Sequence, residues 1–145
     1  MNIARSRITA AIALCSVILA LPPAAATAGD MPSPRTAGAI TYLTGGVGRR
    51  EADAIRQVAH YYPLELEFLL KATPNDEYLS GVRVRIRDAQ QKLVLNVTAE
   101  GPFLLANLPA GRYTVSAERN GRIEERSVEV VHDHHQHILF EWQNA

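Results

Sequence analysis

The residues best suited to chemistry lie near the C-terminus, in the six-residue run 132–137, His-Asp-His-His-Gln-His. Imidazole is the commonest metal ligand in proteins, and alternate residues of a strand project on the same side. Two histidines at alternate positions therefore predict a site for Zn²⁺, Cu²⁺ or Ni²⁺. The predicted ligands of this metal site are His132, His134, His135 and His137.

The same run has a second interpretation, a polar turn that precedes the last predicted strand. A metal site needs three or four ligands at fixed distances, and His60 is the only histidine elsewhere in the chain. We keep both interpretations at this point.

Three arginines at alternate positions, Arg83, Arg85 and Arg87, form the second candidate site. On a strand they share one face at intervals of roughly 7 Å, where they could bind a polyanion such as lipopolysaccharide phosphate or an acidic glycan. Alternatively they pair with acidic side chains of neighbouring strands, and the even charge balance favours this interpretation. The candidate acidic partners are Glu65, Glu67, Glu118 and Glu124.

A glycine-rich segment, Gly45-Gly46-Val47-Gly48, precedes a predicted helix. Free amides at a helix start bind anions, but the spacing fits neither GxGxxG nor GxxxxGK[ST]. We interpret the segment as a tight turn that needs positive φ angles. The chain also lacks GxSxG, HxxE and HExxH motifs, so the sequence predicts neither a nucleophilic enzyme nor a zinc peptidase.

The N-terminus predicts an export signal over residues 1–28. Two arginines precede the apolar stretch Ile8–Leu21, which is too short to cross a bilayer comfortably, and Ala26-Thr27-Ala28 fits the small-x-small cleavage rule. Cleavage would remove Cys15, the only cysteine, and leave no thiol or disulfide chemistry. We therefore expect a periplasmic or secreted protein.

Length and charge limit the classes of function. The 145 residues include 15 basic and 15 acidic side chains, and loss of the two N-terminal arginines leaves a net charge near −2. This balance gives no electrostatic basis for binding nucleic acid. About 117 residues remain after cleavage, enough for one domain over 38–145 behind a Pro-rich flexible linker over 29–37.

Hydrophobic periodicity predicts a mainly β domain with one helix over about 49–61. Residues 39–43 predict a strand, and Leu64–Phe68 alternates so that its leucines and phenylalanine face inward. Asn120-Gly121 is a strong two-residue hairpin signal. The other predicted strands are 81–88, 92–98, 103–108, 111–119, 122–131 and 136–142.

Three segments carry a family resemblance: Gly81–Asp88, Glu100–Phe103 and Asn107–Val115. Together they resemble the G-x-x-V-x-I-x-D strand, the acidic-Gly-x-Phe turn and the L-P-x-G-x-Y-x-V corner of the carboxypeptidase regulatory-like domain. The resemblance covers about 60 residues and implies a transthyretin-like or Ig-like β-sandwich of about seven strands over about 64–142. The glycine loop and helix depart from the family pattern and form a short N-terminal strand-helix extension.

The whole arrangement is similar to small exported proteins of Gram-negative bacteria that carry this domain without an assigned activity. The resemblance implies a non-catalytic binding or scaffolding module of the cell envelope, with protein or glycan partners on a sheet face or edge. It implies no cofactor, and no membrane segment after signal cleavage. The alternative is a periplasmic transition-metal-binding protein that uses the histidines of the run 132–137.

Overall fold

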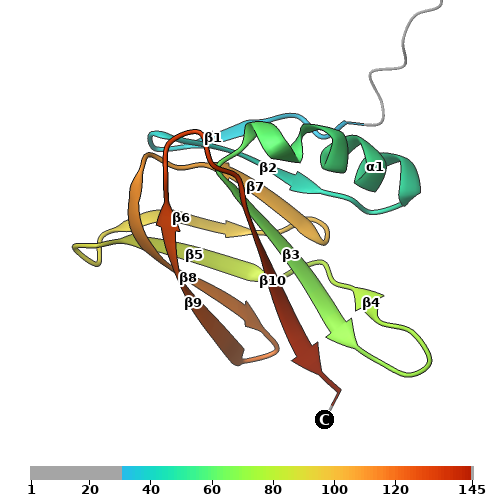
Figure 1. The fold of residues 1–145 in the computed structure, drawn as a ribbon. Helices are drawn as coiled ribbons and strands as arrows, with labels where there is room; N and C mark the ends of the chain where they lie inside the picture. Colours follow the sequence, from blue (N-terminus) through green and yellow to red (C-terminus); the bar gives the residue numbers. More distant parts are fainter. Residues whose placement is uncertain (1–30, 145) are drawn as a thin grey trace, which may run out of the picture.

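The computed structural model describes residues 31–144, so the predicted signal peptide lies outside the described residues. The described chain is mainly β, and its strands form two sheets (Figure 1). No helix in residues 31–144 combines the length and apolar character needed to cross a membrane. The elements are β1 Arg35–Ala37, β2 Ile40–Gly45, α1 Arg49–Val58, a 3₁₀ turn Ala59–Tyr61, β3 Leu64–Lys71, β4 Glu77–Tyr78, β5 Arg83–Asp88, β6 Leu93–Thr98, β7 Phe103–Asn107, β8 Gly111–Arg119, β9 Arg122–Val130 and β10 Gln136–Gln143.

The first sheet, sheet A, has the strand order β1-β2-β7-β3-β10, with β4 paired to β3. The second, sheet B, has the order β6-β5-β8-β9. All strand pairs are antiparallel except β3 and β10, which run parallel over their full length from Leu64↔Gln136 to Lys71↔Gln143. The parallel pair makes β10 the far edge of sheet A, and its two strands lie about 70 residues apart in the sequence.

The inner faces of the two sheets enclose the main core. On β3, Leu64, Leu66 and Phe68 are fully buried, as the alternation predicts, and Val84 and Ile86 of β5 are buried opposite them in sheet B. Tyr113, Val115 and Ala117 of β8 join the same cluster, and Phe140 and Trp142 of β10 close it.

Helix α1 builds a second, smaller core on the outer face of sheet A. Its buried residues Ala52 and Ile55, with Ala59 of the following 3₁₀ turn, pack on Leu43 of β2 and on Phe103 and Leu105 of β7. Figure 1 shows the helix over these two strands. Helical structure therefore spans the predicted range 49–61, with its last turn tightened before Pro63.

The Asn120-Gly121 hairpin forms as predicted. Arg119 pairs with Arg122, and the two turn residues have φ angles of 49° and 75°, the left-handed values that this turn requires. The hairpin fixes the register of β8 and β9, so that Val128 and Val130 face the core.

The structure adds two short strands to those predicted from the sequence. The predicted flexible linker ends early, because Arg35–Ala37 forms β1 and the Arg35 guanidinium lies 2.7 Å from the Glu100 carboxylate. A further short strand, β4, which the sequence did not predict, begins at Glu77. The predicted strand at 39–43 corresponds to β2, which lies inside sheet A between β1 and β7.

Candidate functional site

Four chain connections meet at one end of the two sheets and surround a depression of about 640 Å³. We call it the end pocket. It is lined by residues 60–63 before β3, by 107–110 from the end of β7 into the turn before β8, by 130–135 from the end of β9 into the connection to β10, and by Ala39 in the β1–β2 turn. Its size falls in the range of small-molecule sites, and loops at the ends of sheets are common places for binding residues.

The end pocket gathers four of the five histidines of the chain. His132, His134 and His135 come from the β9–β10 connection, and His60 comes from the 3₁₀ turn after α1. The sequence prediction treated His60 as remote because 72 residues separate it from His132. The parallel pairing of β3 with β10 brings the 3₁₀ turn before β3 close to the connection before β10. No local sequence pattern predicts that pairing.

His135 holds one wall of the end pocket in place. Its Nδ1 lies 2.8 Å from the carbonyl oxygen of Tyr62, and its Nε2 lies 2.9 Å from Oε2 of Glu65. Glu65 was a candidate partner of the arginines on a solvated face, and that prediction is wrong, because the Glu65 side chain is only 10 % exposed. The imidazole of His135 covers it, so both ring nitrogens of His135 are already engaged.

Two of the neighbouring histidines contact other acidic side chains. His137 Nε2 lies 2.7 Å from Oε2 of Glu67, on a separate carboxylate, and His132 Nε2 lies 3.4 Å from Oδ2 of Asp133. Within residues 31–144, no three His, Cys, Asp or Glu side chains are grouped so that they could hold one metal ion. Of the predicted ligands, His132, His135 and His137 each contact a different acidic side chain, namely Asp133, Glu65 and Glu67.

Tyr61 forms the exposed rim of the end pocket. Its side chain is 76 % exposed, and its ring centroid lies 3.9 Å from that of His60. Tyr61, Tyr62 and Asn107 also line an adjoining groove, whose other residues are mainly apolar: Met31, Pro34, Thr41, Leu43 and Val58. The end pocket and this apolar groove therefore form one continuous surface on the two sides of Tyr61.

Tyr113 fixes the turn that forms the floor of the end pocket. Its hydroxyl donates a hydrogen bond of 2.7 Å to the carbonyl oxygen of Pro109, four residues earlier. Burial raises the pKa of the Tyr113 phenol, and the nearby Asp88 carboxylate raises it further. The predicted corner motif over Asn107–Val115 thus acts as a brace between a core strand and the pocket turn.

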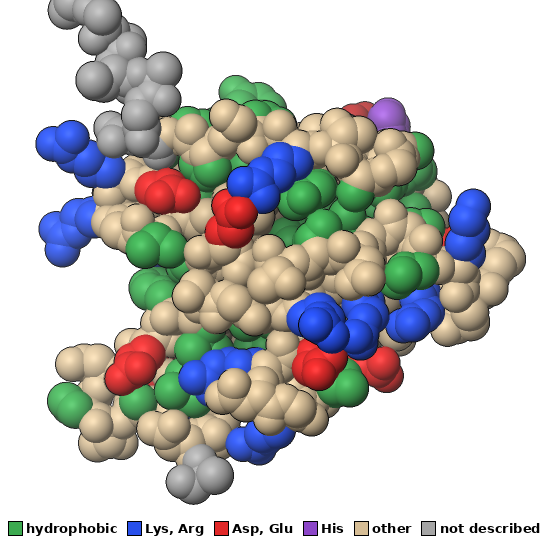
Figure 2. Space-filling view, turned by 180° about the vertical axis from the view of Figure 1, so that it is seen from behind, with side chains coloured by type: hydrophobic (Ala, Val, Ile, Leu, Met, Phe, Trp, Pro, Cys, Tyr) green, Lys and Arg blue, Asp and Glu red, His purple; other side chains and the backbone are tan. Residues whose placement is uncertain are grey.

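The predicted arginine face lies on the outer side of sheet B. Arg85 Nη1 is 3.4 Å from Oε2 of Glu118 on β8, and Arg83 is the register partner of Glu118. Figure 2 shows a row of basic side chains across the back of the molecule, with acidic side chains directly beside it. Glu124, a further candidate partner, lies instead 3.5 Å from Arg126 on its own strand. The arginine face is therefore partly neutralised by its own sheet.

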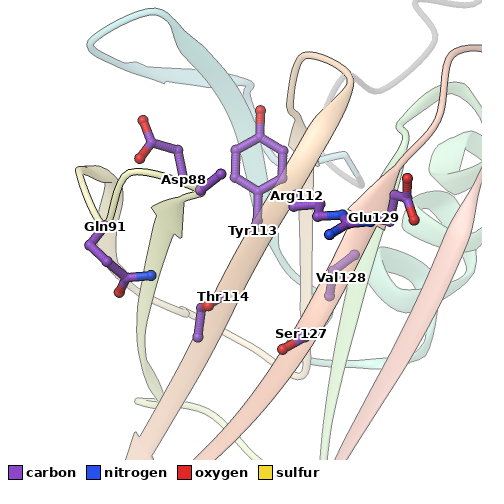
Figure 3. Close-up of a pocket in the computed structure, with 9 residues that line it drawn as sticks. Asp88, Gln91, Arg112, Tyr113, Thr114, Ser127, Val128 and Glu129 are labelled. Atoms are coloured by element: carbon purple, nitrogen blue, oxygen red, sulfur yellow. The ribbon is translucent and has the colours of Figure 1, made fainter.

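A second depression, of about 410 Å³, lies over β5, β8 and β9 (Figure 3). The Asp88 carboxylate at its edge accepts hydrogen bonds of 2.9 Å from the amides of Gln90 and Lys92, so it is occupied in closing its own turn. Arg112 and Glu129 are register partners, and Figure 3 shows Arg112 extending toward Glu129. The Asp88 carboxylate is thus engaged in its own turn, and Arg112 and Glu129 lie opposite each other on paired strands.

The glycine loop before α1 is a tight turn, as interpreted from the sequence. Gly46 and Gly48 have φ angles of 98° and 97°, values that favour glycine. The Gly46 amide donates a 3.0 Å hydrogen bond to Oε1 of Glu51 in the first helical turn. The loop therefore binds the carboxylate of Glu51, from its own chain, at the start of the helix.

Comparison of the chain with protein-family models finds no match, and comparison with curated proteins finds no match either.

Proposed function

We propose that this protein is an exported, non-catalytic binding module of the cell envelope, and that its end pocket is the surface that contacts a protein or glycan partner. The observation that carries the proposal is the convergence of four histidines and two tyrosines on one polar depression at the loop end of the sheets. The sequence predicted contact through a sheet face or edge, whereas we now propose contact through the end pocket.

We also propose that the domain is transthyretin-like and belongs with carboxypeptidase regulatory-like domains. The support is the corner motif, whose tyrosine is buried and bonded to Pro109, and the pair of facing sheets. The export signal and the Gram-negative envelope location are part of the same proposal, and they rest on the sequence of residues 1–28.

The non-catalytic assignment is supported by the side chains of the end pocket. Its lining contains no serine, threonine, cysteine or lysine, so it offers no aliphatic hydroxyl, thiol or amine as a nucleophile. His135 cannot serve as a base while both of its nitrogens are engaged. The metal-binding alternative has less support, because His132, His135 and His137 contact three separate acidic side chains.

The proposal is tested by affinity capture from envelope extract with three forms of the full chain expressed in a Gram-negative host. The first is unchanged, the second carries Tyr61→Ala with His134→Ala, and the third carries Arg83→Glu with Arg87→Glu. All substituted side chains lie outside the core, so each form should fold, which circular dichroism verifies.

We expect a specific partner that is retained by the arginine variant and lost by the end-pocket variant. Loss in the arginine variant alone would move the contact to the face of sheet B. Absence of any partner, with all three forms folded, would overturn the proposal.

A further inference from the structure

The residues that line the end pocket indicate which chemical class of ligand it could bind. It contains no lysine or arginine, the residues that recognise carboxylate and phosphate groups, and Asp133 is its only acidic residue. The exposed surface within it is more polar than apolar, so it does not suit a hydrocarbon ligand. A neutral ligand rich in hydroxyl groups fits this composition best.

The free polar groups of the end pocket suit a ligand that carries hydroxyl groups. His60, His134 and Asn107 are exposed, and each offers both a donor and an acceptor on a planar group. A sugar hydroxyl also donates and accepts at once, so such side chains can pair with it in both directions. His135 is held by Tyr62 and Glu65, and this fixes the wall against which a ligand would rest.

Tyr61 supplies the flat apolar surface that such a ligand also needs. One side of a pyranose ring carries mainly C–H groups, which pack on the face of an aromatic ring. Tyr61 is the most exposed of the large hydrophobic side chains in residues 31–144, and it stands beside the polar groups described above. An exposed tyrosine keeps its hydroxyl in water while its ring remains available for contact.

From this arrangement we propose that the end pocket binds a short neutral oligosaccharide, with one sugar ring on Tyr61 and hydroxyl groups paired to Asn107 and His134. The proposal rests on the proposed function, of which it names the ligand class. The adjoining apolar groove extends past Tyr61 and Tyr62, so a chain of two or three sugars has room to continue along it.

The test is calorimetric titration of the full exported chain with maltotriose, cellotriose and triacetylchitotriose, and with trigalacturonate as the anionic counterpart. We expect at least one neutral trisaccharide to bind with a Kd of about 0.1–1 mM, an ordinary affinity for an open site. Trigalacturonate should bind at least about tenfold more weakly, a difference of about 1.4 kcal/mol.

Variants of two tyrosines locate the site. Tyr61→Ala should weaken binding at least about tenfold, or about 1.4 kcal/mol. Tyr61→Phe should keep the affinity within about threefold, because it retains the ring face. Tyr78→Ala is the matched control, since Tyr78 is also exposed but lies on β4 beside Arg56 and outside the end pocket. It should leave the affinity unchanged.

Absence of binding by all three neutral trisaccharides at about 10 mM, equal binding of trigalacturonate, or full affinity in Tyr61→Ala would each overturn the oligosaccharide proposal. If a protein is captured through the end pocket while no sugar binds, the binding-module function stands and the ligand class is wrong. If neither capture nor titration depends on Tyr61, both proposals fail.

Discussion

Nε2 of His135 lies 2.9 Å from Oε2 of Glu65, while Nδ1 of the same ring lies 2.8 Å from the carbonyl oxygen of Tyr62. Both partners are hydrogen-bond acceptors when Glu65 is ionised. The two contacts tie the ring of His135 both to the segment before β3 and to β3 itself, at the wall of the end pocket.

The first prediction concerns the loss of this pair. His135→Ala should lower the free energy of unfolding by about 2 kcal/mol, because it removes a charge-assisted hydrogen bond and leaves the Glu65 carboxylate buried without that partner. Urea unfolding followed by the fluorescence of Trp142, the only tryptophan, measures this change.

His137→Ala is the matched control for His135→Ala. His137 also contacts a carboxylate of β3, that of Glu67, but its side chain is 46 % exposed. Solvent screens such pairs, so we expect a loss of about 0–1 kcal/mol. Equal losses in the two variants would contradict the special role assigned to His135.

The second prediction concerns the bond between Tyr113 and Pro109. Tyr113→Phe should lower the free energy of unfolding by about 1 kcal/mol, because the buried ring stays while the hydrogen bond of its hydroxyl is lost. Hydrogen exchange of residues 107–111 should also become faster in the variant. An unchanged exchange rate there would show that the hydroxyl does not brace the pocket turn.

The third prediction concerns how the contribution of Tyr113 to the free energy of unfolding depends on pH. The pKa of Tyr113 is raised chiefly by burial and further by Asp88, so the folded state holds the phenol proton to a higher pH than the unfolded chain does. The stability that this group contributes is complete below the unfolded pKa of about 10 and is lost as the pH rises through the folded pKa.

We therefore expect the free energy of unfolding to fall more steeply above about pH 10 in the unchanged chain than in Tyr113→Phe. Urea unfolding at a series of alkaline pH values compares the two slopes. Parallel curves would exclude a contribution from the Tyr113 phenol.

The fourth prediction separates two acidic residues at the start of α1. Glu51→Ala should cost about 1 kcal/mol, because the Glu51 carboxylate accepts the hydrogen bond of the Gly46 amide. Asp53→Ala should cost less than about 0.5 kcal/mol, because Asp53 is exposed and contacts only Arg56 at a distance of 3.2 Å on the helix surface. The same urea experiment ranks the two, and the reverse order would contradict the role given to Glu51.

The fifth prediction concerns metal ions. Because three of the four histidines in the run 132–137 contact separate acidic side chains, we expect zinc and copper to bind more weakly than about 10 µM by calorimetry at neutral pH. Sub-micromolar binding that is lost in His134→Ala would instead support the periplasmic metal-binding protein.

Much of the fold follows from local patterns. Alternation locates β5 to β10 within about two residues, and Asn120-Gly121 specifies the β8–β9 hairpin, because both signals depend on neighbours in the chain. The sequence did not predict β1, because its residues lie in a Pro-rich stretch. The strand forms through its pairing with β2.

The candidate site was less predictable. The run 132–137 was recognised as unusual, yet its role depends on Glu65, Tyr62 and His60, which meet it only through the parallel pairing of β3 with β10. Alternation placed Glu65 on a solvated face, since the pattern of one strand cannot show that a distant histidine will cover it. Long-range pairing of this kind leaves no local trace in either segment.

The end pocket as the binding surface is the central claim, and hydrogen exchange of the chain with and without its bound partner tests it most directly. We predict slower exchange in residues 60–63, 107–110 and 130–135 and unchanged exchange in β5 and β8. Protection confined to β5 and β8, with the end pocket unaffected, would contradict the claim and return the binding surface to the arginine face.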